Sequence, residues 1–249
     1  MLGMRILTYH SVGDYSAPDA ARTVVSAGQF EKQCRLLALL GCRGTTLTEA
    51  LGIRTGRGDR RAVAITFDDG YADNLHNAAP VLARFGFKAT CFIVANYVGG
   101  FNWWDASEAK KALMTKEEIR AWLDAGHEIG SHSLSHAHLP TLSAPEIARE
   151  VRDSRLALQD LLGTPVDHFS YPYGECSRFL VEQVEAAGYC SAVTTRPGIA
   201  RPAAFRFALP RIPIDNRDGL VKYAIKVGTP FLDIRRHQVV QGVGSDRPS

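Results

Sequence analysis

Short β-rich segments alternate with longer amphipathic segments along most of this chain. The β-rich segments are residues 5–8, 62–67, 88–94, 128–131, 168–171, 191–195 and 209–214, and the amphipathic segments are residues 29–40, 77–85, 115–123, 143–162 and 179–187. Such alternation is typical of a parallel sheet whose strands are joined by outer helices. About seven strands favour a closed barrel over an open sheet, so we expect an α/β fold, a distorted TIM-like (β/α)7 barrel.

Two of the expected helices carry capping boxes at their starts. Thr115 is followed three residues later by Glu118, and Ser143 is followed in the same way by Glu146. In a capping box the two side chains satisfy backbone N–H groups that the first helical turn leaves unpaired. We therefore expect helices to begin at these two positions, the second of them ending at Gly163.

The length of 249 residues fits a single domain, because α/β barrels of about 250 residues are common. We assign residues 1–249 to this domain and expect the polar end, residues 241–249, to be frayed. Hydrophobic residues make up 45% and charged residues 22%, which excludes a disordered chain and a collagen-like chain. The net charge of +3 is too small to indicate a nucleic-acid partner.

The sequence predicts neither a membrane span nor a signal peptide. No window approaches the roughly 20 apolar residues that a membrane helix needs, and polar residues 8–10 interrupt the short apolar start. Five scattered cysteines without a CxxC pair favour reduced thiols. We therefore expect a cytoplasmic location and no transmembrane segment.

Polar motifs follow directly after three of the predicted strands. Residues 68–70 (DDG) follow the strand at 62–67, residues 132–136 (HSLSH) follow the strand at 128–131, and residues 172–174 (PYG) follow the strand at 168–171. Each motif alone is a weak signal, since such residues are common in turns. Their conjunction at the carboxyl ends of barrel strands, where barrels build their sites, predicts an active site.

The residue types in these motifs indicate metal chemistry. Two adjacent carboxylates at a strand end cannot both be buried as ions without a nearby cation. His132 and His136 with one carboxylate form a ligand set for a divalent metal, with zinc as the default and Co²⁺, Ni²⁺ and Mn²⁺ as other candidates. Such a metal generates a hydroxide from water at neutral pH, and the second aspartate can take the proton.

Together these motifs resemble the polysaccharide deacetylases of carbohydrate esterase family 4, whose shared unit is the NodB homology domain. The resemblance extends over about residues 6–214. It implies that Asp68 is the catalytic base and that Asp69, His132 and His136 bind the metal. It also implies the activity, a metal-dependent hydrolysis of the N-acetyl group of an N-acetylated sugar or glycan precursor.

The third family motif corresponds to residues 171–174 (YPYG). The resemblance implies that Tyr171 and Pro172 line the substrate groove and that the backbone N–H of Tyr173 stabilises the oxyanion. Many members begin this motif with an arginine that orients the catalytic aspartate, but Ser170 stands there in this chain. Arg211, at the end of a late strand, is the predicted substitute.

A second departure concerns the general acid. Many members supply it from a C-terminal Leu-x-His motif, which this chain lacks. Members similar to the exopolysaccharide and poly-N-acetylglucosamine deacetylases instead carry Tyr-His near the N-terminus. Tyr9 and His10 fit that variant, so His10 is the predicted acid.

A loop after the strand at 88–94 contains Trp103, Trp104 and Asp105. Aromatic rings pack on sugar rings through apolar contact, and a carboxylate can bond a sugar hydroxyl. These residues are therefore candidates for substrate binding. Local packing of the tryptophans and a capping role for Asp105 are the alternatives.

Two other functions remain open at this stage. The same site could hydrolyse a non-sugar C–N bond. The missing third-motif arginine and the missing Leu-x-His motif are compatible with a catalytically inactive glycan-binding module. If the chain is cytoplasmic, the accessible substrate would be a precursor, such as a lipid-linked or nucleotide-linked sugar, or a small glycoside. The sequence leaves the sugar identity and the oligomeric state undetermined.

Overall fold

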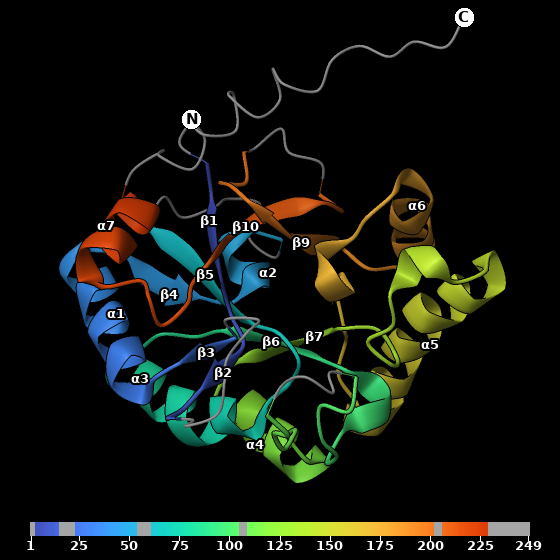
Figure 1. Ribbon diagram of the computed structural model, residues 1–249, viewed down its shortest axis with the longest axis horizontal. Helices are drawn as coiled ribbons and strands as arrows, with labels where there is room; N and C mark the ends of the chain where they lie inside the picture. The colour runs from blue at the N-terminus through green and yellow to red at the C-terminus, as the bar shows by residue number, and fades with distance from the viewer. Residues whose placement is uncertain (1–2, 15–22, 54–60, 105–108, 202–205, 229–249) are drawn as a thin grey trace, which may run out of the picture.

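The computed structural model describes residues 3–14, 23–53, 61–104, 109–201 and 206–228. Asp105 and the end of the chain at 241–249, for which we made sequence-based predictions, lie outside these ranges. Figure 1 shows the described residues as a central group of strands with helices around it.

Seven parallel strands close into a barrel. They are β1 (Arg5–Tyr9), β5 (Ala62–Phe67), β6 (Thr90–Ile93), β7 (Glu128–Ser131), β8 (His168–Ser170), β9 (Ser191–Pro197) and β10 (Leu209–Pro213). Each strand pairs with the next in this order, and β10 pairs back to β1, where Ile212 lies opposite Leu7. The predicted seven-stranded α/β barrel is therefore confirmed.

Two short strand pairings were not predicted. Strand β4 (Arg43–Thr45) pairs with the first half of β5, whereas β6 pairs with the second half of β5. β4 therefore lies at the amino end of the barrel, directly before the short helix α2 (Leu47–Ala50). The second pairing joins β2 (Ser11–Val12) to β3 (Val24–Val25).

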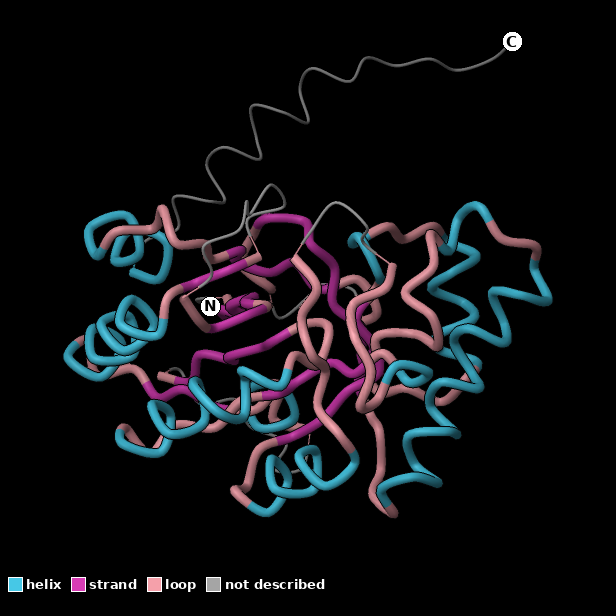
Figure 2. Tube along the Cα trace, turned by 60° about the horizontal axis from the view of Figure 1, so that its bottom comes forward, coloured by secondary structure: helices cyan, strands magenta, loops and turns pink. Residues whose placement is uncertain are grey.

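The longer helices of the described ranges cover the outside of the barrel, as Figures 1 and 2 show. They are α1 (Ala27–Leu39), α3 (Ala79–Arg84), α4 (Lys116–Asp124), α5 (Ala144–Leu162), α6 (Arg178–Ala186) and α7 (Leu220–Gly228). Single turns lie at Asn74–Ala78, Ala95–Tyr97, Leu139–Thr141 and Pro172–Gly174. Both predicted capping boxes are confirmed, at the starts of α4 and α5. Within the described ranges, no helix combines the length and hydropathy that a membrane span requires.

The inside of the barrel is layered. Successive side chains of a strand point to opposite faces, so alternate residues enter the lumen. Along β5 the order Ala64, Thr66 and then Asp68 leads from an apolar middle to a polar carboxyl end. Phe92 and Val193 belong to the apolar middle layer. Polar side chains therefore lie at the carboxyl end of the barrel, next to the motifs identified in the sequence.

Candidate active site

Asp69, His132 and His136 form a buried cluster at the carboxyl ends of β5 and β7. One ligand atom of each residue lies within 4.8 Å of the others. The Nε2 atoms of His132 and His136 are each 3.4 Å from Oδ1 of Asp69. The structure thus brings together the three residues that the sequence suggested as metal ligands.

The donor atoms of this cluster fit a divalent cation. Nδ1 of His132 lies 2.8 Å from the carbonyl oxygen of Ser170, which can only accept, so Nδ1 carries a proton. In the neutral ring, Nε2 therefore presents its lone pair toward Asp69. Oδ1 of Asp69 is buried without a hydrogen-bond partner among the described residues. Facing acceptor atoms repel each other unless a cation lies between them, and two imidazoles with one carboxylate suit zinc.

Electrostatics in the cluster also favour a cation. Burial works against ionisation of Asp69, yet the two imidazoles, whose Nε2 atoms lie 3.4 Å from its Oδ1, hold the pKa of the carboxyl well below the usual value. Burial would likewise lower the pKa of His132, but the Asp69 and Asp68 carboxylates outweigh it and raise that pKa. The negative charge that attracts a proton here would attract a metal ion in the same way.

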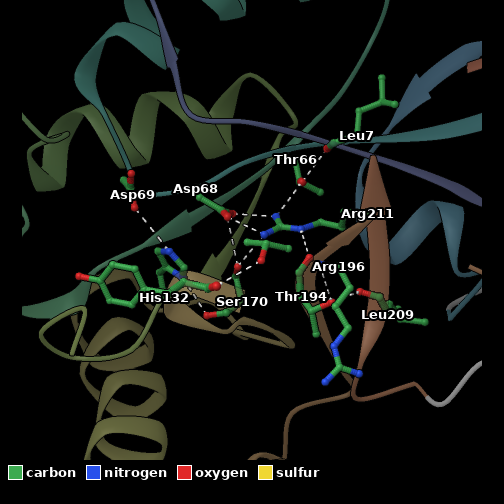
Figure 3. A network of polar contacts seen from close by, with 12 residues as sticks. Leu7, Thr66, Asp68, Asp69, His132, Ser170, Thr194, Arg196, Leu209 and Arg211 are labelled. Carbon is green, nitrogen blue, oxygen red and sulfur yellow. Dashed lines mark hydrogen bonds and ion pairs between the residues drawn. The ribbon is translucent and has the colours of Figure 1, made fainter. Parts of the chain in front are cut away.

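Asp68 is held by a buried ion pair with Arg211. Nη1 of Arg211 donates to Oδ1 of Asp68 at 2.8 Å and Nη2 donates to Oδ2 at 2.5 Å, which makes the contact bidentate. The guanidinium also donates to Thr194 O, Thr66 Oγ1 and Ser170 Oγ at 2.9, 3.1 and 3.1 Å. Figure 3 shows this network. Arg211 is fully buried, so it fixes the plane of the carboxylate that it contacts.

This ion pair keeps Asp68 ionised. Burial alone would raise the pKa of the carboxyl, but the Arg211 guanidinium, with His132 and His10, brings it below the usual value. An ionised, oriented carboxylate next to the cluster can accept a proton from water. Its basicity is modest, because the same guanidinium stabilises the charged form.

His10 lies on the neighbouring strand end. β1 and β5 are paired with Tyr9 opposite Phe67, and the backbone N–H of Asp68 donates to Tyr9 O at 3.0 Å. His10 is half-buried and is one of the groups that lower the pKa of both Asp68 and Asp69. The predicted acid is therefore placed beside the cluster, while its role stays a prediction.

Four non-glycine residues in the described ranges have positive φ, and all four lie at this site. They are Asp69 at 73°, Ser133 at 65°, His136 at 59° and Tyr173 at 57°. The left-handed region costs a non-glycine residue about 1–2 kcal/mol, so surrounding contacts must hold the backbone there. Such strain at two candidate ligands is typical of a functional site.

Glu150 of α5 holds the loop between the two histidines. Its carboxylate accepts from the backbone N–H groups of Leu134 and Ser135, each at 3.0 Å, and from Ser135 Oγ at 2.6 Å. Ser133 Oγ accepts from the N–H of His136 at 3.0 Å. Sequence analysis missed Glu150, because nothing local to a helix residue indicates a contact with a loop 15 residues away.

The two tryptophans of the candidate substrate loop behave differently. Trp104 stacks on the ring of His136, with centroids 4.7 Å apart and planes at 22°. Trp103 is 59% exposed, and its ring lies 3.8 Å from the Lys110 ammonium. Trp104 therefore contacts a candidate ligand directly, whereas Trp103 faces solvent on the same loop.

The structure places Tyr171 and Pro172 of the third motif in the interior. Both side chains are buried, and the hydroxyl of Tyr171 donates to Phe207 O at 2.9 Å. Tyr171 also packs edge-on against Phe169 in the core. Of the aromatic side chains of this motif, Tyr173 is the exposed one, so it alone can face a substrate with its ring.

Comparison with known proteins adds independent findings. Residues 55–192 match the family model described as "Polysaccharide deacetylase". YxkH of Bacillus subtilis (strain 168), which is named for the same family, is 31% identical over 211 residues, covering 84% of this chain and 70% of that protein. The poly-beta-1,6-N-acetyl-D-glucosamine N-deacetylase of Staphylococcus aureus (strain MRSA252) is 27% identical over 197 residues. This match covers 77% of this chain and 68% of that protein.

A solved structure shows the same fold. The deacetylase PplD of Streptococcus pyogenes, in complex with acetate, superposes with a TM-score of 0.77. The alignment covers 89% of this chain and 96% of that one at 22% sequence identity. At this identity the likeness establishes the arrangement of the barrel and its helices.

Proposed function

This chain belongs to the polysaccharide deacetylase family, and from this premise we propose that it is a metal-dependent hydrolase of the N-acetyl group of an N-acetylated sugar or glycan precursor. The observation that carries the proposal is the buried Asp69–His132–His136 cluster beside an Asp68 carboxylate that Arg211 orients. The poly-N-acetylglucosamine N-deacetylase among the relatives supports a sugar substrate.

The residues of the cluster would hold one divalent ion. Two imidazoles and one carboxylate suit Zn²⁺, and Co²⁺, Ni²⁺ and Mn²⁺ accept the same donor types. When bound, such an ion supplies Lewis acidity, which lowers the pKa of water to about 7 and polarises a carbonyl oxygen.

Residues around the cluster would each perform one of the remaining steps of the hydrolysis. Asp68 accepts a proton from the attacking water, whose oxygen forms a bond to the acetyl carbon, and Arg211 keeps Asp68 ionised. The backbone N–H of Tyr173 donates to the developing oxyanion. The C–N bond then breaks and His10 gives a proton to the departing amine, so the products are acetate and a free amino sugar.

Arg211 bears on the rival proposal of an inactive binding module. That alternative rested on Ser170 standing where many members have an arginine, and on the missing Leu-x-His motif. In this chain a guanidinium from β10 reaches the same aspartate and also donates to Ser170 Oγ at 3.1 Å. The orienting contact is therefore supplied from another strand, which supports an active enzyme.

Metal content and acetate release test the proposal together. We expect about one zinc ion per chain in the wild type after zinc dialysis, no bound zinc in Asp69→Ala, and acetate release by the wild type from oligomers of N-acetylglucosamine. A folded wild type without bound metal would contradict the mechanism. Metal binding with turnover of simple non-sugar amides alone would instead support the non-sugar alternative.

A further inference from the structure

The imidazole of His138 joins the two loops that build the site. His138 follows His136 by two residues, in the loop after β7. Its ring stacks on the ring of Tyr173, with centroids 3.6 Å apart and planes at 3°. Its Nδ1 lies 3.2 Å from Oε2 of Glu175. One side chain thus contacts two residues of the loop after β8, on which the proposed oxyanion donor lies.

Tyr173 has a conformation that needs such support. Its φ of 57° lies in the left-handed region, which is unfavourable for a residue with a Cβ. On the backbone side, Thr195 Oγ1 donates to Tyr173 O at 3.2 Å, and a Cβ at Gly174 would overlap Thr195. On the ring side, the Tyr173 ring packs in a T-shaped arrangement with the His136 ring, with centroids 4.7 Å apart, and it stacks on the face of His138.

The contacts of His138 are at the surface and contribute little to the core. The side chains of His138 and Glu175 are 52% and 44% exposed. Exposed ion pairs add little to folding stability, so an effect of His138 should be local. The part of the molecule that it touches is the Tyr173 turn.

We infer that His138 is a positioning residue, which holds Tyr173 so that its backbone N–H faces the acyl oxygen of the substrate. The inference rests on the proposed function, because the oxyanion role of Tyr173 is part of it. An oxyanion donor acts on the transition state more than on the bound substrate. Loss of the His138 stack should therefore lower kcat and leave KM nearly unchanged.

Two substitutions separate stacking from other roles of the imidazole. His138→Ala removes the ring, whereas His138→Phe keeps an aromatic face for Tyr173. With zinc-loaded protein and a pentamer of N-acetylglucosamine, we expect His138→Ala to lower kcat about tenfold, less than the roughly 10²-fold cost of a 1 Å misplacement of a catalytic group. His138→Phe should stay within about twofold of the wild type. Unchanged kcat in His138→Ala, or equal loss in both variants, would overturn the inference.

His76→Ala is the matched control. His76 also lies at the surface, 59% exposed, and pairs with a carboxylate, Glu118, at 2.6 Å. It differs from His138 in lying on the turn Asn74–Ala78, away from the Tyr173 loop. We expect its kcat to match the wild type, so a loss there equal to that of His138→Ala would count against a specific role for His138.

A second readout needs no turnover. Amide hydrogen exchange of a peptide spanning residues 171–175, measured on zinc-loaded protein, should be faster in His138→Ala and unchanged in His138→Phe and His76→Ala. Unchanged exchange in His138→Ala would overturn the inference even if the enzyme is active. Faster exchange in a protein that releases no acetate from any sugar would support the positioning of Tyr173 by His138 and would contradict the proposed function, and with it the oxyanion role, instead.

Discussion

The barrel holds a carboxylate beside an imidazole at both of its ends, and the two clusters differ in whether their polar atoms have hydrogen-bond partners. At the amino end, Glu128 accepts from Thr90 Oγ1 at 2.7 Å, from the N–H of Thr48 at 3.2 Å and from Thr48 Oγ1. Nε2 of His168 bonds Thr48 Oγ1 at 2.7 Å, and Nδ1 bonds Ser191 Oγ at 2.8 Å. Both carboxylate oxygens and both ring nitrogens of this cluster therefore have partners.

In the cluster at the carboxyl end, some buried polar atoms have no hydrogen-bond partner. Oδ1 of Asp69 and Nδ1 of His136 are buried without hydrogen-bond partners among the described residues, and both residues have positive φ. No positive φ occurs at Thr48, Glu128 or His168. Unsatisfied buried atoms and strained backbone mark a ligand site, whereas a satisfied cluster of the same residue types holds α2 against the barrel.

The largest expected effect concerns the base. We expect Asp68→Asn to reduce acetate release about 10³-fold, since general base catalysis contributes about 10²–10⁴-fold. The zinc content should stay near that of the wild type, because Asp68 is not among the ligand atoms of the cluster. Mass spectrometry of bound metal and a steady-state assay of acetate check this. Near-normal turnover would remove Asp68 from the base role.

A pair of amide substitutions compares the two clusters directly. Asp69→Asn should weaken zinc binding by more than about 100-fold, the upper range for loss of a partner outside the direct ligands. Glu128→Gln should leave zinc affinity within about twofold of wild type, because the apolar layer lies between the two ends. Competition with a chromogenic chelator measures both. Equal loss in the two variants would mean that the clusters are not independent.

The amino-end cluster should matter more for folding stability than for zinc binding. Glu128→Gln replaces a charged acceptor of several hydrogen bonds and should lower the free energy of unfolding by about 2 kcal/mol. Urea unfolding of metal-free protein measures this, with Glu182→Gln as the control, since Glu182 pairs with Arg178 on the surface. A cost for Glu128→Gln no larger than that of the control would show that the amino-end cluster does not hold the fold.

A smaller expected effect is the pH dependence of the contribution of Glu128 to the free energy of unfolding. Burial opposes ionisation of Glu128, but hydrogen bonds from His168, Thr48 and Thr90 lower its pKa to about 2. The unfolded chain, with the ordinary pKa of 4.5, takes up the proton first as pH falls, so this stabilisation is present above pH 4.5 and lost toward pH 2. Between pH 7 and 3.5 the loss is on the order of 1 kcal/mol.

The difference between wild type and Glu128→Gln isolates this group from other carboxylates. The gap in unfolding free energy between the two proteins should narrow from pH 7 to pH 3.5. A gap that stays constant would show that Glu128 has an ordinary pKa in the folded protein.

Local patterns explain why much of this molecule was predictable. Alternating segments predicted the barrel, and the motifs at 68–70 and 132–136 place their chemistry within a few residues of a strand end. Arg211 could be proposed as the partner of Asp68, 143 residues away, because both were expected at strand ends on one barrel face, although Arg211 lies within β10 in the structure.

The remaining features depend on contacts that leave no local pattern. Thr48, Glu128 and His168 are separated by 80 and 40 residues and belong to no motif, so only the closed barrel brings them together. Strand β4 has only three residues, and one of them is Gly44. Glycine is uncommon in strands, so the composition of this segment does not predict a strand. The burial of Tyr171 depends on Phe169 and Phe207 around it, which the motif does not contain.

The stack of Trp104 on His136 gives the protein an optical reporter of its own site. The chain has three tryptophans, and of these Trp104 has its indole against a candidate metal ligand, whereas Trp122 is buried against His127. A paramagnetic ion such as Co²⁺ or Ni²⁺ bound beside that indole would quench its emission. Titration of the metal-free protein could therefore be followed by intrinsic fluorescence, and Trp104→Phe would remove the signal while Trp103→Phe would keep it.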